Sequence, residues 1–579
     1  MKVARVTVRN FRGFGEVEVV PRGHVLLVGE PRAGRSDLLA AIALVLTIEA
    51  PRSLTEFDFH GCNVDAPIEV EVVLSELEHD LVQRLLEQLE FWDPNARVLI
   101  EAAEDISGLP DGAVPAVRVA FRGEWDEDEA TVRQTRYWPK LSDPGADVYR
   151  RVSREDRAAL PFSVLSGGRP LNLAPQGDFR DFLGDADPAG LSSALDDLAA
   201  GMDQVAMDLG NAPVVHDGVG AVFAPLWSLL RVSSPDPAAV RFLPDGGGMA
   251  ALLRALMPAL DLADGAGHLP LYRHGSTAVA AIGAAEAVAT GAARHGVVLV
   301  DDFGDALDTS GAERLSRRLR ESVGQAWLST RRPEIARAFE PDELVRLSLA
   351  NVAPAIRQVH YGVEPRTRPE RVVGRELHRQ ILPAMTAHAL IVVEGPHDLS
   401  AYLALADRMS HDPTVVPAAS GARMIDAGGD NGGIDKVDRV CALARQLGFH
   451  VVALVDFDND LTLAAERLAR LEAAADHVVR LPHKHAVEHA VTDCSDAAVL
   501  AALAELNASF SLPLPAGWQA LSGTDLRDAA RAVLKSNGGL HAEFIQTLDD
   551  ADLPSLALTA IRAAVACSIG ATATPHVQL

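Results

Sequence analysis

The stretch that decides the fold is residues 25–36, which read VLLVGEPRAGRS. The apolar run 25–28 predicts a buried strand, and it passes directly into a glycine-rich turn and the start of a helix. Two segments with alternating apolar and polar residues, 3–8 and 16–20, come before it and predict two further strands. The chain therefore opens like an α/β domain.

The turn in this stretch has the spacing of a Walker A phosphate loop. Gly29 and Gly34 allow backbone N–H groups to wrap a phosphate, and Ser36 is suited to bind the Mg²⁺ that accompanies ATP. Arg35 stands where a lysine is expected, and its guanidinium keeps the charge but not the compact geometry of an ammonium group. A glycine-rich turn by itself can also be purely structural.

The second half of this nucleotide site is predicted far downstream. Residues 297–302, VVLVDD, form an apolar strand that ends in two carboxylates. Asp301 is expected to help hold Mg²⁺, and Asp302 stands where a glutamate usually positions the attacking water. Between the two motifs, residues 160–260 are rich in Ala, Leu and Asp at helical spacing, which predicts a helical insertion.

A carboxylate cluster is predicted in the C-terminal third of the chain. Residues 390–398, LIVVEGPHD, and residues 451–458, VVALVDFD, both run an apolar strand into acidic residues. Two parallel strands would bring Glu394, Asp456 and Asp458 to one edge of a sheet. Carboxylate oxygens suit Mg²⁺ or Mn²⁺, and without a metal their repulsion would raise their pKa values. A DxD taken alone can equally be a solvated turn.

The chain is long enough for several domains, because domains usually hold 100 to 200 residues. The Pro- and Arg-rich stretch 363–375 has the composition of a linker, and a new alternation of strands and helices follows it. The predicted division is a split nucleotide domain at 1–160 and 246–365, a helical insertion at 161–245, a linker at 366–385 and a further α/β domain at 386–579.

Composition limits the classes of function. The net charge of −27 argues against a DNA-coating protein, so any contact with nucleic acid must be local and assisted by metal. The sequence has no uninterrupted apolar stretch of membrane-spanning length and only four isolated cysteines, which favours a cytoplasmic protein with no membrane contact. The chain has only five lysines among 53 basic residues, so a lysine near a site is chemically notable.

The N-terminal motifs resemble the ATPases of the RecF, SMC and OLD (overcoming lysogenization defect) group. The resemblance rests on VRNFRGF at 8–14, RHGS at 273–276 as a loose signature loop, and LSTRRP at 328–333. It implies an ABC-type P-loop ATPase domain with a helical insertion. The family usually has a histidine where this chain has Arg331, so this departure and those at Arg35 and Asp302 put ATP hydrolysis in doubt.

The carboxylate region resembles the Toprim domain of OLD nucleases, and with the ATPase part it gives the architecture of Gabija-type nucleases. Asp398 completes an EGxxD pattern, Glu488 follows the next strand, and Lys535 opens the segment LKSNGG. The resemblance implies a C-terminal Toprim α/β domain with a two-metal nuclease site. It assigns the metal ligands Glu394, Asp398, Asp456, Asp458 and Glu488, and the catalytic residues Glu394, Asp456, Asp458 and Lys535.

The resulting expectation is a DNA endonuclease that uses Mg²⁺ or Mn²⁺ and is regulated by ATP with Mg²⁺. The resemblance also implies a homodimer or higher homo-oligomer through the insertion, a role in phage defence or DNA repair, and an accessory helicase or defence partner. His397, His483 and His485 are interpreted as polar neighbours of the site. The alternative is a nucleotide-sensing scaffold that binds DNA ends or a partner protein. A topoisomerase or primase ranks last, because no nucleophilic tyrosine or zinc module stands out.

Overall fold

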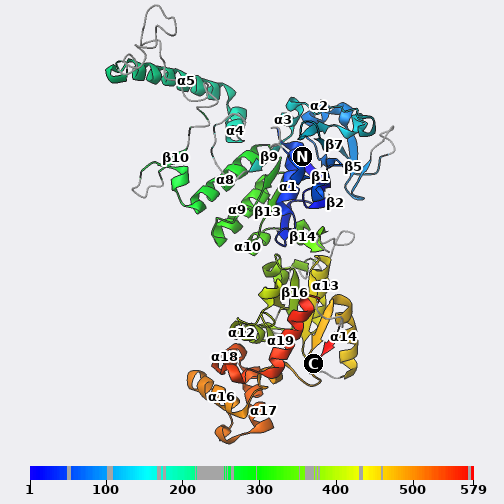
Figure 1. Cartoon of the computed structure of the whole chain (residues 1–579), viewed down its shortest axis with the longest axis vertical. Coiled ribbons are helices and arrows are strands. Elements are labelled where there is room, and N and C mark those ends of the chain that lie inside the picture. Colours follow the sequence, from blue (N-terminus) through cyan, green and yellow to red (C-terminus); the bar gives the residue numbers. More distant parts are fainter. Residues whose placement is uncertain are drawn as a thin grey trace, which may run out of the picture. The chain divides into compact units, whose positions relative to one another are not determined.

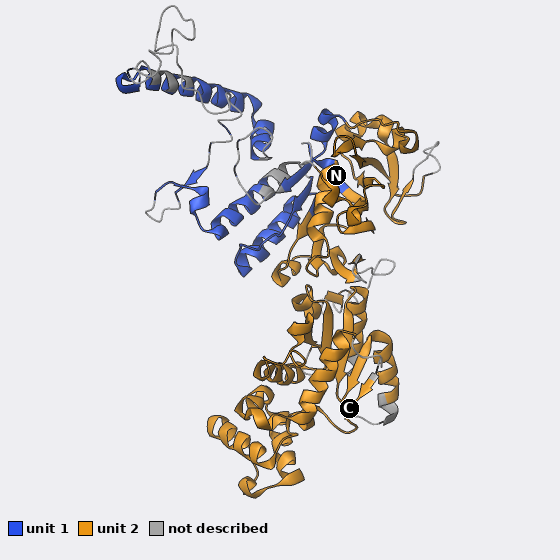
Figure 2. Cartoon of the chain, in the orientation of Figure 1, with its two compact units in different colours: residues 1–2, 46–51, 153–326 blue, residues 3–45, 52–152, 327–579 orange. Residues whose placement is uncertain are grey.

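The structure is a computed structural model, and it falls into two compact units (Figure 2). Unit 1 comprises residues 1–2, 46–51 and 153–326, and unit 2 comprises 3–45, 52–152 and 327–579. The described residues are 1–48, 54–100, 109–165, 171, 173, 178–215, 217, 253, 256, 258–261, 267–294, 296–350, 353–358, 371, 374–375, 379–428, 434–457, 461–570 and 576–579. The predicted linker at 363–375 lies almost entirely outside them.

The N-terminal part of unit 2 contains a mainly antiparallel sheet in the order β2-β1-β4-β7-β5-β6, with β8 paired to β7. The predicted strands near residues 3–8 and 16–20 are confirmed as β1 and β2. The bounds are β1 (Lys2–Phe11), β2 (Phe14–Val19), β4 (Ile68–Ser75), α2 (His79–Arg84), β5 (Glu90–Asp93), β6 (Val98–Ile100), β7 (Val114–Asp126) and β8 (Thr131–Tyr137).

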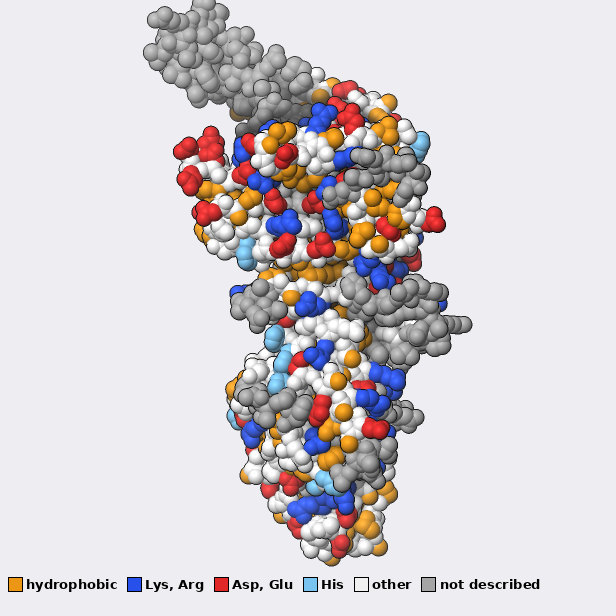
Figure 3. Space-filling view, turned by 90° about the vertical axis from the view of Figure 1, so that its right-hand side faces the viewer, with side chains coloured by type: hydrophobic (Ala, Val, Ile, Leu, Met, Phe, Trp, Pro, Cys, Tyr) orange, Lys and Arg blue, Asp and Glu red, His pale blue; other side chains and the backbone are white. Residues whose placement is uncertain are grey.

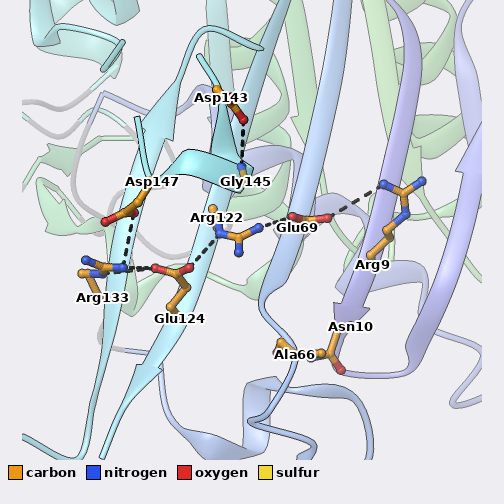
Figure 4. A network of polar contacts seen from close by, with 10 residues as sticks. All are labelled: Arg9, Asn10, Ala66, Glu69, Arg122, Glu124, Arg133, Asp143, Gly145 and Asp147. Atoms are coloured by element: carbon orange, nitrogen blue, oxygen red, sulfur yellow. Dashed lines mark hydrogen bonds and ion pairs between the residues drawn. The ribbon is translucent and has the colours of Figure 1, made fainter. Parts of the chain in front are cut away.

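One face of this sheet carries a ladder of alternating charges that crosses β1, β4, β7 and β8 (Figure 4). Glu69 lies between Arg9, at 3.8 Å, and Arg122, while Glu124 lies between Arg122 and Arg133. Cross-strand pairs of opposite charge stabilise neighbouring strands modestly. Because these arginines are paired with acids, this face is not a free basic surface for DNA phosphates. Basic and acidic side chains are likewise interspersed on the face in Figure 3.

The predicted phosphate loop follows β3 (Val25–Gly29), all five residues of which are buried. β3 pairs in parallel with β14 (Leu344–Ala350) and with β13 (Gln325–Ser329), and β15 (Ala353–Gln358) pairs antiparallel with β14. Strands buried on both faces read as continuous apolar runs, which explains why β3 was visible in the sequence. Helix α1 (Arg35–Leu46) begins directly after the loop, and α10 (Pro333–Ala336) follows β13.

Unit 1 contains the acidic strand end and the described part of the predicted insertion. β12 (Val297–Val300) pairs in parallel with β9 (Phe162–Leu165). The remaining elements are α3 (Arg154–Ala159), α4 (Asp178–Ala186), α5 (Pro188–Asn211), β10 (Ala259–Leu260), β11 (Leu269–Pro270), α8 (Ser276–Arg294) and α9 (Thr309–Ser322). The long helix α5 exposes Val205 and Leu209, one turn apart.

The C-terminal part of unit 2 is built on a five-stranded parallel sheet in the order β17-β16-β18-β19-β20. Its strands are β16 (Ala389–Val393), β17 (Ala422–Asp426), β18 (His450–Val455), β19 (His477–Arg480) and β20 (His576–Gln578). Parallel pairing confirms the alternation of strands and helices predicted from residue 387 onward.

Helices cover both faces of this sheet (Figure 1). Helices α12 (Pro396–Arg408) and α19 (Ser555–Ser568) pack on one face, where Ala389, Ile391 and Val393 join one large apolar core with them. α13 (Ile434–Gln446) and α14 (Leu461–Ala474) pack together on the other. The remaining helices are α15 (Val487–Val491), α16 (Asp496–Phe510), α17 (Gly523–Ser536) and α18 (Leu540–Thr547).

Candidate active site

Two neighbouring parallel strands deliver acidic residues to the same edge of the C-terminal sheet. β16 and β18 pair with Val393 opposite Leu454, so Glu394 and Asp456 both follow the last paired residues. The Asp456 backbone N–H donates a hydrogen bond to the Glu394 Oε1 at 3.0 Å. The strand ends are therefore tied together at the position where parallel α/β sheets usually bind ligands.

Asp398 joins this edge from the first turn of α12. Gly395 precedes the helix, Pro396 opens it, and the Gly395 N–H donates to Asp398 Oδ2 at 3.2 Å. Proline suits the first helical position because its missing N–H would have no partner there. Asp398 is buried, and burial together with the neighbouring Glu488 raises its pKa to about 6. Its capping role thus holds a carboxyl group inside the site.

The acidic groups at this edge destabilise one another as anions. Burial, followed by repulsion from Asp398, Glu394 and Glu488, raises the pKa of Asp456 well above its ordinary value. The Tyr402 ring is also fully buried, and its phenol pKa is raised by that burial and by the negative charge of Asp456 and the other acids. Carboxylates gathered in this way are compensated by a bound cation or by protons.

Glu488 belongs to the first turn of α15 and is the best-compensated acid of the group. Burial acts to raise its pKa, but the nearby His541 ring and the attraction of His541 and Lys535 outweigh it, so the pKa is lowered. Lys535, in the last turn of α17, is exposed and therefore contributes its charge from the rim of the site. The predicted lysine lies near the predicted acids.

Sequence reasoning missed His541, which lies on α18. Its side chain is fully buried, its Nε2 lies 3.8 Å from Glu488 Oε1, and both of its ring nitrogens are without a hydrogen-bond partner. The ring stacks on His397 with centroids 5.4 Å apart and an interplanar angle of 10°. No local motif marks His541, because its place beside Glu488 comes from the packing of helices distant in sequence.

The other predicted neighbours lie on the loop after β19. His485 and Lys484 exchange backbone hydrogen bonds with Phe457, the residue after Asp456. His483 packs edge-on against the Phe457 ring at 5.0 Å, and Arg480 lies over that ring at 4.4 Å. Positive and aromatic groups thus border the acidic edge, as expected for polar neighbours of the site.

The described residues do not form a closed metal cage. Within the ranges described above, no three His, Cys, Asp or Glu side chains stand close enough together to hold one ion. Asp458, the second carboxylate of the predicted DxD, lies outside the described residues. The donor set nevertheless suits a hard cation, because it consists of oxygen ligands whose mutual repulsion a divalent ion would relieve.

The predicted phosphate loop has the backbone that its glycines suggest. Gly29 has a φ of +132°, and a Cβ there would lie 1.9 Å from the Leu347 carbonyl oxygen. Gly34 has a φ of +90°, and a Cβ there would lie 2.7 Å from the Phe14 ring. Neither position can accept a side chain without movement of the backbone or of a buried ring.

Arg35 and Ser36 open helix α1, and Ser36 is exposed. The Arg35 Nη1 donates to the Thr330 carbonyl oxygen at 2.8 Å, while Arg331, the next residue, is exposed. Asp301 and Asp302 follow β12 in unit 1, where both are exposed and Asp301 Oδ1 accepts from the Asp302 N–H. The loop therefore belongs to unit 2 and the acidic pair to unit 1.

Comparisons with known proteins find likenesses to solved structures of low sequence identity. No family model matches the chain, and no curated protein does. Among solved structures, an Smc head bound to the C-winged helix domain of ScpA is 15% identical, with a TM-score of 0.30, and covers 62% of this chain and 98% of its own. The SMC head domain from Thermotoga maritima is 12% identical, with a TM-score of 0.27 and coverages of 62% and 100%.

A third structure, the Pyrococcus furiosus Smc head domain with an extended coiled coil bound to the C-terminal domain of ScpA, is 10% identical. Its TM-score is 0.34, and the match covers 62% of this chain and 96% of that one. Likenesses this distant assign no activity. Of the helices described, none is long and apolar enough to cross a membrane.

Proposed function

We propose that this chain is a metal-dependent DNA endonuclease of the Toprim type, regulated by ATP at an ABC-type ATPase domain. The observation that carries the proposal is the meeting of Glu394, Asp456, Asp398 and Glu488 at the carboxyl edge of one parallel sheet. A purely structural edge would not place two buried acids, Asp398 and Asp456, where burial and the neighbouring acids raise their pKa values. A site that binds divalent cations has a reason to do so.

The acids would hold Mg²⁺ or Mn²⁺, with Asp458 completing the set. When bound, such ions activate the attacking water and neutralise charge on the leaving oxygen. Lys535, exposed at the rim and attracted to Glu488, is placed to stabilise charge on the scissile phosphate. Hydrolysis by this set breaks a phosphodiester bond, and no residue becomes covalently attached to DNA.

Cleavage of supercoiled plasmid with Mg²⁺ or Mn²⁺ tests the proposal directly. We expect nicking by the wild type, loss of nicking in Glu394→Ala, and a change in rate when ATP is added. Asp412→Asn is the matched control, because Asp412 is a partly exposed acid of the same sheet domain that accepts hydrogen bonds from Thr414 and Arg562. Equal nicking by wild type and Glu394→Ala would show that the acidic edge is not the nuclease.

A second candidate is a nucleotide-sensing scaffold that binds DNA ends or a partner protein. It is favoured by the Arg35 guanidinium, which donates a hydrogen bond to the carbonyl oxygen of Thr330, the residue after β13. An arginine engaged in this way suits slow ATP turnover better than efficient hydrolysis. ATP binding and DNA-end binding without cleavage under any metal condition would favour this candidate.

The proposal includes a homodimer or higher homo-oligomer formed through the helical insertion. The exposed Val205 and Leu209 on α5 support it, because apolar side chains one turn apart form a stripe on a helix. Analytical ultracentrifugation of the full chain tests it. A mass of 61.5 kDa at all concentrations would exclude the dimer.

A further inference from the structure

Arg346 is a buried charge in unit 2 whose Nε, Nη1 and Nη2 all make hydrogen bonds. It lies on β14, beside the strand that leads into the phosphate loop, and its side chain is fully buried. Its Nη2 lies 3.4 Å from the Oε1 of Glu30, the second residue of the loop. A buried guanidinium is stable only when nearly all of its donors are satisfied.

The remaining donors of Arg346 bond to the C-terminal domain. Nε donates to the Met385 carbonyl oxygen at 3.3 Å, Nη2 to that of Ala387 at 2.6 Å, and Nη1 to that of Leu447 at 3.0 Å. The guanidinium also lies 3.6 Å from the centroid of the Phe449 ring. Arg346 therefore holds backbone from two separate segments at once.

These two segments enter the two strands that carry the acids. Met385 and Ala387 come directly before β16, and Leu447 comes directly before β18. Each strand is five or six residues long, which is roughly 17 to 20 Å of extended chain. Glu394 and Asp456 follow the C-terminal ends of these strands and belong to the proposed metal site. Arg346 therefore binds the backbone near the N-terminal ends of the same two strands.

The phosphate loop is tied to the same point by Glu30. Its backbone N–H donates to the Leu347 carbonyl oxygen at 3.0 Å, and its Oε1 accepts from the Leu349 N–H at 3.4 Å. Its Oε2 lies 3.2 Å from Nδ1 of His388, the residue before β16. The Glu30 carboxylate is thus shared between the β14 strand and the entrance of β16.

A glycine turn shows how closely the parts meet. Gly448, between Leu447 and Phe449, has a φ of +75°, and a Cβ there would lie 2.8 Å from Arg357 Cγ and 3.2 Å from Ser348 Oγ. The turn into β18 thus packs directly on β14 and β15. A movement of the phosphate loop relative to β14 would therefore change the packing of this turn against Ser348 and Arg357.

We infer that Arg346 is a positioning residue that couples the phosphate loop, through Glu30, to the strands β16 and β18 that carry the acidic edge. The inference rests on the proposed function and names the means by which ATP regulates it. When phosphate binding moves the loop, Glu30 moves the Arg346 guanidinium. The segments before β16 and β18, which are bonded to that guanidinium, then move with it. Coupling of this kind needs a structural element whose conformation depends on both the nucleotide site and the acidic edge. Arg346, with its neighbours Glu30 and Phe449, is that element.

Hydrogen–deuterium exchange of the full chain with and without Mg-ATP tests the inference without reference to cleavage. The peptides to follow cover residues 385–394 and 447–456. In the wild type we expect ATP to change exchange in both. In Arg346→Met and in His388→Asn, at ATP concentrations that saturate each variant, we expect the change to fall to about a fifth or less, the lower end of ordinary allosteric coupling.

Glu340→Gln is the matched control, because Glu340 forms an exposed ion pair with Arg375 at 2.7 Å and should leave the response as in the wild type. His388 is half exposed, so His388→Asn keeps the test valid if Arg346→Met does not fold. A full response in the foldable variants overturns the inference. A wild type that binds ATP without a response also overturns it and leaves the nuclease standing. A wild type that does not bind ATP overturns nucleotide regulation itself, and the inference with it.

Discussion

Two strand ends in unit 2, the end of β3 and the shared end of β16 and β18, both place charged residues after buried parallel strands, but they differ in how these charges are satisfied. After β3, the loop charges Glu30 and Arg35 are bonded to other parts of the chain, through Arg346 and the Thr330 carbonyl oxygen. After β16 and β18, Glu394 and Asp456 face other acids. The charges after β3 are therefore neutralised without a ligand. The negative charges after β16 and β18 are neutralised by a bound cation or by protons. This difference is the reason why we propose the C-terminal edge as the site of DNA cleavage.

The largest effect is expected for Asp456→Ala, which tests the difference between the acidic edge and the phosphate loop. Removal of a central ligand should lower the rate of DNA cleavage at least about a thousandfold, which is about 4 kcal/mol of transition-state free energy. The same substitution at the first edge, Arg35→Ala, should change the rate much less, because Arg35 acts only through nucleotide. Single-turnover cleavage with Mn²⁺ measures both. Similar losses in the two variants would remove the distinction between the edges.

Arg346→Met tests the charges after β3, where loss of the Arg346–Glu30 ion pair should destabilise the folded protein. Loss of the guanidinium leaves the Glu30 carboxylate buried without its main partner, which should lower the free energy of unfolding by about 3 kcal/mol. Adding Glu30→Gln should recover part of that loss, because the stranded charge is then gone. Urea unfolding of the two single variants and the double variant gives the coupling energy. Additive losses would mean that the pair is not a unit.

The acidic edge should behave in the opposite way, so that removing a charge stabilises the metal-free protein. The pKa of Asp398 is raised from 3.8 to about 6, so the folded state favours its protonated form. The stability from this preference is present below pH 3.8 and is lost as the pH rises through about 6. The full effect is about 3 kcal/mol, since each pKa unit is about 1.4 kcal/mol.

Asp398→Asn should therefore unfold later than the wild type at pH 7.5 in EDTA, and the two should converge near pH 4. Asp412→Asn is the control of opposite sign. Hydrogen bonds from Thr414 and Arg562 lower the Asp412 pKa to about 2, so its contribution is present above pH 3.8 and lost as the pH falls through about 2. A destabilised Asp398→Asn at pH 7.5 would show that the edge is already neutralised.

The two edges also differ in how much the sequence revealed. The strands β3, β16, β18 and β12 were predictable because buried parallel strands are short apolar runs, and the acids after them are adjacent in sequence. The place of Glu394 beside Asp456 followed from parallel pairing alone. Local patterns therefore gave the positions of most predicted site residues, while their roles stay predictions.

The partners of these residues were not predictable, because they come from contacts between distant elements. Nothing around Arg346, within the strand LVRLSLA, indicates that its side chain reaches Met385 and Leu447. His541 is likewise a lone histidine on a short helix until α18 packs beside Glu488. Long-range packing decides which polar groups are buried together, and a single sequence does not contain that pairing in readable form.

The smallest expected effect comes from restoring the usual loop residue with Arg35→Lys. A lysine is too short to keep the bond to the Thr330 carbonyl oxygen, and its compact ammonium suits a phosphate better than a tethered guanidinium. We expect about three- to tenfold tighter ATP binding, which is about 1 kcal/mol, with DNA cleavage at saturating ATP little changed. Isothermal titration with a non-hydrolysable ATP analogue measures the affinity. Weaker binding by Arg35→Lys would show that the guanidinium itself contacts phosphate and that the loop is adapted to arginine. The phosphate loop after β3 would then be a nucleotide site in which Arg35 gives up its bond to Thr330 and binds phosphate instead. In that case the loop and the acidic edge would differ only in how strongly each depends on its ligand.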